Sequence, residues 1–341
     1  MKLNQILCRS LALGFIFAAS KGAAAPLDEG LVAYYRFNGD TADSSGNARQ
    51  LIATDTLLVA ERFGRPASAC KFNGSSSLLA AGQNEPTLNL NLAFTISCWV
   101  KIANFNPEGS TLVRKDGDVG FNVLNFGSPN RLSIEAFKNG RQYRGFAGTP
   151  PVGRWCMLSA TWDGNSFAVY IDGQNQAVSQ DDIARTLPIY PITIGSSLPW
   201  PDQGLDGVID EVRIYNRALP AADVASLFGL ETPSRYFTGA WYETKTISGA
   251  TLSAGEIQLR LFEDKSCSAV REFNNQPFDY ARGTWSANKK GVVTFNLIGD
   301  LADEVFRGTV KKGAFGGSFS GGGHVGKFAV SELPLAQDPD R

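Results

Sequence analysis

Histidine is the scarcest functional residue in this 341-residue chain, because His324 is the only one. Nucleophilic triads, histidine-ligated zinc and imidazole acid–base catalysis therefore have almost nothing to use. His324 lies in Gly321-Gly-Gly-His-Val-Gly-Lys-Phe328, which nearly spells a phosphate-binding loop. Phe328 stands where that loop requires Ser or Thr, and strand-like residues follow where a helix should begin. We interpret the run as a glycine-rich hairpin.

The chain also lacks an excess of basic residues and a long apolar run. Residues 1–24 combine basic residues, a short apolar run and small residues, which is the pattern of a secretory signal. The apolar run is too short to be a permanent membrane anchor. Cleavage after Ala24 would remove three basic residues and no acid, which lowers the formal net charge from −1 to −4. We expect a secreted, periplasmic or cell-surface protein without a transmembrane segment in its mature chain, and the weak acidity argues against nucleic acid as a partner.

Turn residues, in contrast, are plentiful. The chain holds 36 Gly and 16 Pro between short alternating runs, which predicts two all-β units. In the first unit, at 30–229, Asn-Gly and Asp-Gly pairs separate the strands at hairpin-like intervals, as in a β-sandwich. A linker at 230–235 with a Pro and polar residues precedes the second unit at 236–333, and 334–341 reads as a flexible tail.

The second unit alternates apolar and polar residues and has little helical periodicity, as at Val293, Phe295 and Leu297. It therefore predicts an antiparallel up-and-down sheet or a small barrel. The phrase at 237–242 is similar to the opening of avidin or lipocalin barrels. The predicted strands lie near 236–247, 255–263, 281–287, 291–298, 304–311, 314–320 and 324–331.

Residues 207–220 join a period-2 strand to the start of a short helix. Alternation places Asp210 on the same inward face as Val212, while Glu211 takes the opposite face. A carboxylate in the interior is costly unless a cation, a metal or several donors meet it. An apolar stripe after Pro220, followed by Gly229, predicts the helix and its end.

Phrases in a fixed order carry the clearest signal of fold. They are Leu31-Val-Ala-Tyr-Tyr-Arg-Phe-Asn-Gly39, Asp43-Ser-Ser-Gly-Asn47, Cys70-Lys-Phe-Asn-Gly74, Val169-Tyr-Ile-Asp-Gly173, and the runs 94–100, 155–164, 194–196 and 207–220. Together they resemble the bacterial form of the laminin G-like family of concanavalin A-like jelly rolls. The resemblance covers about residues 30–229, and it implies a jelly-roll β-sandwich there. We therefore predict an all-β protein in which this sandwich is followed by a small antiparallel β-sheet or barrel domain.

Four cysteines remain after the signal is removed, and two of them could pair. Alternation turns Cys98 and Cys156 toward the interior of the sandwich. The family resemblance implies that their strands are neighbours, so a Cys98–Cys156 disulfide is possible in an oxidising compartment. The alternative is that both are buried free thiols that act as small hydrophobic side chains.

Segments at both ends of the first unit contain Asp and Asn side chains, whose oxygens predict a cation site. The resemblance implies that its first and last strands are neighbours and that a metal there is common. Asn38, Asp43 and Asp210 offer the oxygen ligands that calcium prefers, so we predict a structural calcium ion. The alternative is an Asx turn at Asp43 and an ion pair from Asp210 to Arg36 or Arg213.

Closely spaced carboxylates on one strand would indicate a glycosidase, as in some jelly-roll relatives. The candidates here are Asp206, Asp210 and Glu211. Alternation sends Asp210 and Glu211 to opposite faces, and Asp206 has no further partner. The pattern predicts that the protein is not an enzyme.

A ligand site is predicted at the loop 196–204, where Trp200 stands between two prolines on a segment too polar for the core. Sugar rings stack on such aromatic faces, and arginines bind hydroxyl groups through directed hydrogen bonds. Arg141, Tyr143 and Arg144 add a polar and aromatic patch. We predict that these four residues bind ligand. The alternative is that Trp200 only anchors its loop.

These observations favour a secreted, non-catalytic protein that binds carbohydrate or extracellular glycan. The alternative is a structural or adhesive module for an extracellular matrix or cell-surface protein. An exposed aromatic in a concave face would favour a glycan, whereas a broad flat apolar patch would favour a protein partner. A polysaccharide-active enzyme is the least favoured function.

Overall fold

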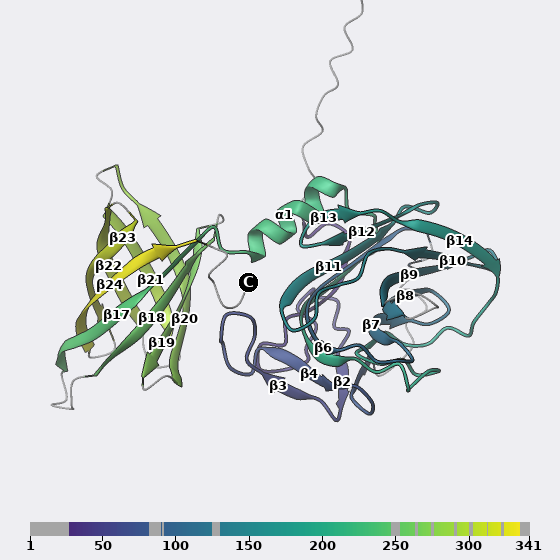
Figure 1. The fold of residues 1–341 in the computed structure, drawn as a ribbon, viewed down its shortest axis with the longest axis horizontal. Helices are drawn as coiled ribbons and strands as arrows, with labels where there is room; N and C mark the ends of the chain where they lie inside the picture. Colours follow the sequence, from purple (N-terminus) through teal and green to yellow (C-terminus); the bar gives the residue numbers. More distant parts are fainter. Residues whose placement is uncertain are drawn as a thin grey trace, which may run out of the picture.

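The protein consists of a β-sandwich and a closed β-barrel, joined in the described part of the chain by one short helix (Figure 1). This architecture confirms the predicted jelly roll followed by a small barrel. The expected secretory signal at 1–24 and all but the first residue of the expected tail lie outside the described residues. The computed structural model describes residues 27–81, 90, 92–124, 130–246, 253–262, 265–273, 276–289, 292–299, 303–311, 313–321 and 324–334.

The first sheet brings the two ends of the sandwich domain together. Strand β1 pairs antiparallel with β16, with Leu31 opposite Tyr215. The phrases at 31–39 and 207–220 are therefore neighbours in space, as the resemblance implied. In spatial order the sheet contains β13 (Gln174–Gln176), β12 (Phe167–Ile171), β11 (Trp155–Trp162), β6 (Phe94–Asn104), β16 (Asp206–Tyr215), β4 (Ala69–Asn73) and β3 (Leu57–Val59), and β1 (Leu31–Tyr35) lies beside β16.

The second sheet packs on the first across the main apolar core. The core forms because alternate residues of a strand point to the same side. Ile96 and Cys98 on β6 and Leu158 on β11 are completely buried in it, and burying a large apolar side chain stabilises the fold by about 1.5–3 kcal/mol. In spatial order the second sheet contains β14 (Ser179–Ala184), β10 (Arg141–Phe146), β9 (Arg131–Lys138), β8 (Val119–Leu124), β7 (Ser110–Lys115), β15 (Thr193–Ile194), β5 (Leu78–Ala81) and β2 (Leu51–Thr54).

Helix α1 (Ala221–Glu231) connects the two domains and covers the outer side of the first sheet. Its Val224 and Leu227 pack with Trp99 and Tyr215. The helix confirms the prediction from the apolar stripe after Pro220, but it continues two residues beyond Gly229, the predicted stop. No helix in the described part of the chain is long and apolar enough to cross a membrane.

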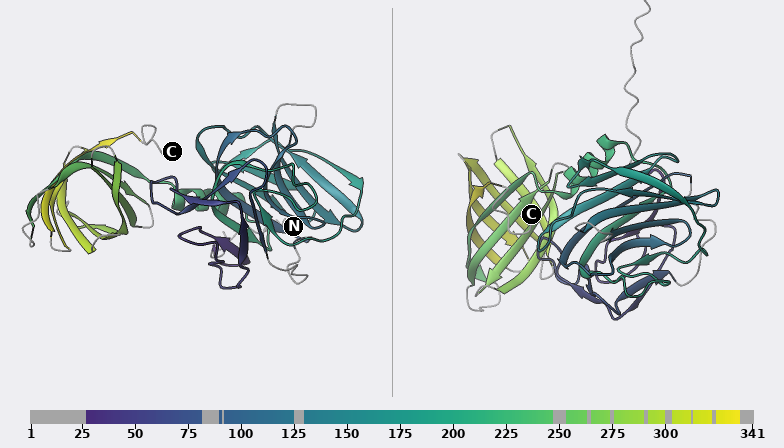
Figure 2. Two further views of the ribbon diagram at one scale, coloured as in Figure 1. Left: turned by 90° about the horizontal axis from the view of Figure 1, so that it is seen from below. Right: turned by 45° about the vertical axis from the view of Figure 1, so that its right-hand side comes forward.

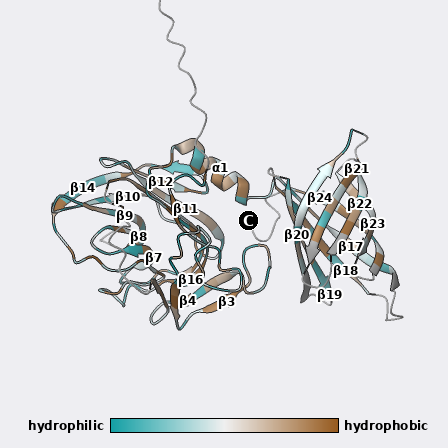
Figure 3. Cartoon of the chain, turned by 180° about the vertical axis from the view of Figure 1, so that it is seen from behind, coloured by the Kyte–Doolittle hydropathy of each residue, from teal (hydrophilic) through white to brown (hydrophobic). Residues whose placement is uncertain are grey.

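The barrel closes through eight antiparallel strands, and the left view of Figure 2 looks nearly along its axis. Apolar and polar residues alternate along these strands, as Figure 3 shows. The apolar set includes Trp241 and Phe319, whose rings lie 6.3 Å apart in the interior. The strands are β17 (Arg235–Thr246), β18 (Ala254–Leu261), β19 (Ser266–Phe273), β20 (Gln276–Ala287), β21 (Val292–Gly299), β22 (Asp303–Lys311), β23 (Ala314–Gly321) and β24 (His324–Leu333).

Strand β19 is the barrel strand that the sequence did not predict. Its inward residues include Cys267 and Ala269. These side chains are small, so the strand shows weak apolar alternation although its register in the barrel is regular. The glycine-rich run near His324 does form a hairpin, between β23 and β24, as predicted.

The barrel rests on the sandwich through a small apolar cluster. Phe63, from the segment before β4, packs with Phe262, Val270 and Tyr280 of the barrel. The rings of Phe63 and Phe262 meet edge to face at 5.5 Å. This cluster is an apolar contact between the two domains.

Candidate ligand-binding face

The second sheet has an outer face, which we define as the side that points away from the first sheet. On β8, Val119 and Phe121 enter the core, so Gly120 and Asn122 between them belong to the outer face. Glu135 of β9 lies opposite Gly120 and belongs to the same face. Polar residues therefore occupy the outward positions of strands whose inward positions are apolar.

Arg114 organises the buried floor of this outer face. Its guanidinium donates to Asp116 Oδ1 at 2.7 Å, to Asn122 Oδ1 at 3.2 Å and to Glu135 Oε2 at 3.0 Å. Ser197, at the start of the predicted ligand loop, donates to the second oxygen of Asp116 at 3.1 Å. Charge-assisted bonds of this kind are short and directional, so the floor is rigid.

A row of polar atoms across three strands has no partner in the described part of the protein. Thr111, Asn122 and Ser133 lie opposite one another on β7, β8 and β9. Thr111 Oγ1, Asn122 Nδ2 and Ser133 Oγ are buried there without a hydrogen bond. An unpaired buried polar group costs about 1–3 kcal/mol. Apolar residues would make a more stable floor, so these polar positions point to a use other than stability.

Trp200 lies over this floor. Gly195, which has a φ of 78°, ends β15 and starts the loop, and a turn bond from the Gln203 amide to the Trp200 carbonyl shapes it. The Cζ atoms of Arg114 and Arg185 lie 4.9 and 5.6 Å from the centre of the Trp200 ring. The ring is half-buried and borders a depression of about 190 Å³. The lining residues are Arg114, Leu124, Glu135, Gln142, Arg185, Trp200 and Gln203.

A second depression, of about 250 Å³, adjoins the first and shares Leu124 with it. Arg144 lines it and makes a two-pronged ion pair with Asp181 at 2.7 and 2.8 Å. Arg131 lies 5.5 Å from the ring of Phe146 and donates to backbone carbonyls and to a serine hydroxyl. The outer face thus presents two half-buried aromatic rings, each beside arginines held in fixed directions.

The structure places only two of the four predicted ligand residues on the outer face. Trp200 and Arg144 belong to the outer face. Tyr143 points the other way and packs 5.2 Å from the ring of Trp162, at the main core. Arg141 has the same strand parity as Tyr143 and pairs with Asp182 at 2.6 Å. Strand alternation separates neighbours in sequence, so the predicted patch is not one surface.

Sequence reasoning missed Arg114, Arg131, Glu135, Phe146 and Arg185. A signal for some of them was present, since polar residues at every second position of the otherwise apolar strands 119–124 and 131–138 mark one side of a sheet. The position of the Trp200 loop over those strands depends on contacts between segments that are distant in the sequence. A local sequence pattern does not predict such contacts.

Asp43, a predicted calcium ligand, instead organises the loop after β1. Its carboxylate accepts hydrogen bonds from the backbone amides of Tyr34, Ser45 and Arg49 at 3.0, 2.9 and 3.0 Å. The bond from Ser45 makes this an Asx turn. The Asx turn considered as the alternative is therefore observed, whereas the ion pair expected from Asp210 to Arg36 or Arg213 is made to Arg62 instead.

The other two predicted calcium ligands lie apart from any metal-like cluster. Asn38 is in the bend after β1, and Asp210 is in an ion pair with Arg62 at 3.0 Å. Among the described residues, no group of three or more His, Cys, Asp or Glu side chains could hold a metal ion. The Asp43 carboxylate accepts backbone hydrogen bonds and Asp210 pairs with Arg62, so the structure shows both side chains in contacts with the protein itself.

A β-bulge in β16 changes the predicted direction of Asp210, while Glu211 points outward as predicted, so the two acids lie on one side and not on opposite faces. The register against β6 shifts between Asp210 and Arg213, and Glu211 has a φ of 52°. Val212 enters the core as predicted, but Asp210 meets Arg62 on the outer side of the first sheet, where Arg62 stacks 4.4 Å from the ring of Trp99. The inward direction predicted for Asp210 was wrong, because an extra residue in the bulge reverses the alternation.

The predicted disulfide is wrong, because the four described cysteines are free and buried, as in the alternative considered from the sequence. Cys98 and Cys156 do face the core on paired strands, as expected. Cys98 lies opposite Leu158, however, and Cys156 lies opposite Val100, so the two thiols are diagonal neighbours. Diagonal positions are about 7–8 Å apart, whereas a disulfide needs Cα atoms within about 6.8 Å.

Comparisons with solved structures find similar folds. Domain 4 of AbnA, a GH43 extracellular arabinanase from Geobacillus stearothermophilus solved with arabinotriose, has 23% identity and a TM-score of 0.44, over 58% of this chain and 97% of that one. The binding domain of Paraclostridial Mosquitocidal Protein 1 has 15% identity and a TM-score of 0.47, over 89% and 92%. A structure of botulinum neurotoxin type C, whose cell entry is described as dependent upon interaction with two ganglioside molecules, has 12% identity and a TM-score of 0.45, over 91% and 95%. None of these likenesses carries a functional argument.

The chain matches no curated protein sequence. Residues 72–225 match the laminin G family profile described as the concanavalin A-like lectin/glucanases superfamily. The match contains the second-sheet strands β7 to β10 and β14, the Trp200 loop and the bulged strand β16. This confirms the resemblance read from the sequence phrases: the segment 72–225 belongs to the concanavalin A-like lectin/glucanases superfamily.

Proposed function

We propose that the protein binds carbohydrate, without catalysis, on the outer face of the second sheet. The observation that carries the proposal is the arrangement of Trp200 and Phe146 beside Arg114, Arg131 and Arg144 above a rigid polar floor. Sugars combine apolar ring faces with hydroxyl groups in fixed directions. Aromatic rings next to fixed hydrogen-bonding groups suit that chemistry, because the binding groups are ordered before the ligand arrives.

One feature of the outer face supports a binding role over hydrolysis. The superfamily description covers lectins as well as glucanases, so membership leaves both open. On the outer face, however, the carboxylates of Asp116, Glu135 and Asp181 are all committed to arginines at 2.7–3.0 Å. A glycosidase needs one carboxylate free to protonate the leaving group and another free to act as base or nucleophile.

A protein partner is the second candidate, and the surface supports it less. Large exposed apolar residues such as Ile52, Leu92, Ile189 and Val325 belong to different strands and loops. They do not form the single broad patch that a stable protein interface needs. Secretion and a structural calcium ion remain part of the proposal, and they rest on the sequence.

The test is a glycan array probed with the full mature chain, with and without a chelator. For the glycan that binds best, we expect Trp200→Ala to weaken binding by about 1–3 kcal/mol, because an aromatic contact and its buried area are lost. Isothermal titration calorimetry measures the change. A calcium requirement would appear as loss of binding in chelator.

Arg141→Gln is the matched control, since Arg141 lies on the same strand as Arg144 but not on the outer face. It should bind the glycan as the wild type does. If Trp200→Ala binds the glycan normally while remaining folded, the outer face is not the site. If no glycan binds the wild type, the protein-binding alternative takes its place.

A further inference from the structure

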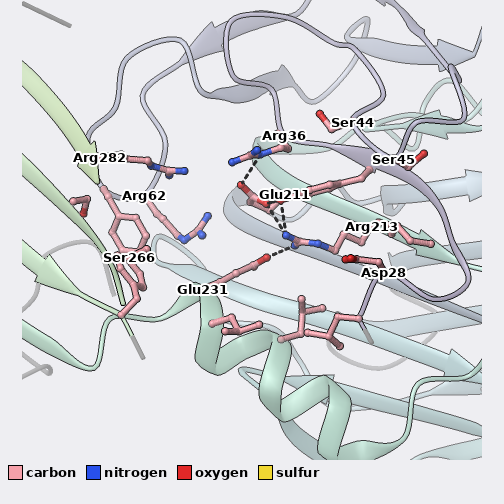
Figure 4. Close-up of a pocket in the computed structure, with 18 of the residues that line it drawn as sticks. Asp28, Arg36, Ser44, Ser45, Arg62, Glu211, Arg213, Glu231, Ser266 and Arg282 are labelled. Carbon is pink, nitrogen blue, oxygen red and sulfur yellow. Dashed lines mark hydrogen bonds and ion pairs between the residues drawn. The ribbon is translucent and has the colours of Figure 1, made fainter. Parts of the chain in front are cut away.

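A cavity of about 830 Å³ lies where the sandwich meets the barrel (Figure 4). The sandwich contributes Arg36, Glu211 and Arg213 to its lining, and the barrel contributes Ser266 and Arg282. The cavity is on the outer side of the first sheet. It is therefore separate from the carbohydrate face, which belongs to the second sheet.

Three arginines from distant parts of the chain converge in this cavity. Arg36 follows β1, Arg62 precedes β4 and Arg282 is on β20. Figure 4 shows their guanidinium groups pointing toward one space between the domains. Positive groups brought close together repel one another, so the arrangement costs free energy unless negative charge compensates it.

The carboxylates of the protein leave some of the guanidinium donors unused. The closest carboxylate contacts are Arg62 Nη1 to Asp210 Oδ2 at 3.0 Å, Arg282 Nη2 to Glu61 Oε1 at 3.5 Å and Arg36 Nε to Glu211 Oε1 at 4.0 Å. Arg144, in contrast, binds its carboxylate through two nitrogens at 2.7 and 2.8 Å. The Nε atoms of Arg36 and Arg62 are buried without a hydrogen-bond partner in the described part of the chain. These guanidinium groups therefore keep donors for a further acceptor.

Arg213 engages two of the carboxylates that line the cavity. It forms ion pairs with Glu211 and Glu231. Glu211 also accepts a hydrogen bond from the Tyr34 hydroxyl, and Glu231 accepts one from the Trp99 indole. Burial raises the pKa of Glu231 despite the opposing effect of Arg213. Glu211 and Glu231 are therefore shared between Arg213 and the converging arginines.

We propose that this cavity binds the oxyanion group of a small polar molecule, held between the two domains by Arg36, Arg62 and Arg282. Guanidinium groups bind carboxylates and phosphates through paired hydrogen bonds. The volume falls within the usual range of small-molecule sites. The hydroxyls of Ser44 and Ser45 line the same cavity and suit the rest of a polar ligand.

The test is isothermal titration calorimetry of the full mature chain with sodium glucuronate, with inorganic phosphate and with glucose. Glucuronate and phosphate offer the same oxyanion chemistry from two sources, a sugar acid and a phosphate group. We expect at least one of them to bind and glucose not to bind at this site. Arg36→Gln and Arg282→Gln should each weaken that binding by about tenfold, as expected for loss of one charge-assisted hydrogen bond.

Arg36 and Arg282 are chosen because their side chains are 42% and 36% exposed, so both variants should fold. Circular dichroism and thermal melting check this. Arg141→Gln, on the other sheet, removes a guanidinium far from the cavity and should leave anion binding unchanged. The proposal is overturned if neither anion binds, or if the folded Arg36→Gln and Arg282→Gln variants bind as tightly as the wild type.

Discussion

At the scale of single residues, Asp210 and Arg62 form an ion pair in which both side chains are nearly inaccessible, 2% and 4% exposed. Removing one partner of such a pair leaves a buried charge without compensation. We expect Asp210→Ala to lower the free energy of unfolding by about 3–5 kcal/mol. Urea denaturation at neutral pH measures the loss.

The exposed pair of Arg141 and Asp182 provides the comparison, because solvent screens it. Asp182→Ala should cost less than about 1 kcal/mol. Similar losses in the two variants would mean that Arg62 finds another partner when Asp210 is removed.

The environment of Asp43 leads us to expect that the stability of the fold depends on pH. Burial alone would raise its pKa, but hydrogen bonds from the amides of Arg49, Ser45 and Tyr34 outweigh burial and hold the pKa below the ordinary value of 3.8. A carboxyl whose pKa is lower in the folded state stabilises the fold above its unfolded pKa, and this contribution is lost as the pH falls through the folded value. Stability should therefore fall with acidification below about pH 3.8.

Asparagine cannot titrate, so the stability of the Asp43→Asn variant should depend less on pH at acidic pH than the stability of the wild type. Thermal melts of both proteins from neutral pH down to about pH 2 give the comparison. An unchanged slope in the variant would show that other carboxyls control acid unfolding.

At the scale of elements, Gly195 fixes the junction between β15 and the Trp200 loop. Its φ is 78°, and a Cβ at this position would lie 2.0 Å from the ring of Phe72 in the core. Gly195→Ala therefore adds a steric clash to the backbone strain. We expect a loss of about 1–3 kcal/mol from the clash, beyond the strain itself, in a urea denaturation experiment.

Gly140 separates the two effects, because its φ is 73° and a Cβ there would contact nothing within 4 Å. Gly140→Ala should show the strain alone. Equal losses in the two alanine variants would mean that Phe72 moves aside without cost.

The alternation of apolar and polar residues predicted most of the strands and which side of each is buried. Alternation identified the buried sides of β6, β11 and most barrel strands, because burial imposes a period of two on the sequence. It failed at Asp210, where a bulge that depends on pairing with β6 adds a residue, and at β19, whose inward side chains are small. The ligand face was predicted only through Trp200 and Arg144, since its floor joins strands and a loop that are distant in the sequence.

At the scale of the whole molecule, Phe63 is the main apolar contact between sandwich and barrel. Replacing it with alanine removes its packing on Phe262 and Val270 while leaving the cores of both domains intact. We expect Phe63→Ala to weaken domain docking by up to about 3–5 kcal/mol. Small-angle X-ray scattering should show a larger radius of gyration.

Leu57→Ala is the control, since Leu57 is 67% exposed on the nearby strand β3. Its scattering curve should match the wild type. If Phe63→Ala also matches, the ion pairs around the interdomain cavity hold the domains together without the apolar cluster.

The pairing of β1 with β16 determines how the molecule would respond to mechanical load. Leu31, at the start of β1, lies opposite Tyr215, at the end of β16, so the chain enters and leaves the sandwich at the same end of one strand pair. A pulling force between the N-terminal side and the barrel would therefore peel these strands apart one hydrogen bond at a time, without shearing them all together. A chain tethered at one end and loaded at the other would open first at this seam, at low force, and would release the barrel from the sandwich before the core of either domain gave way.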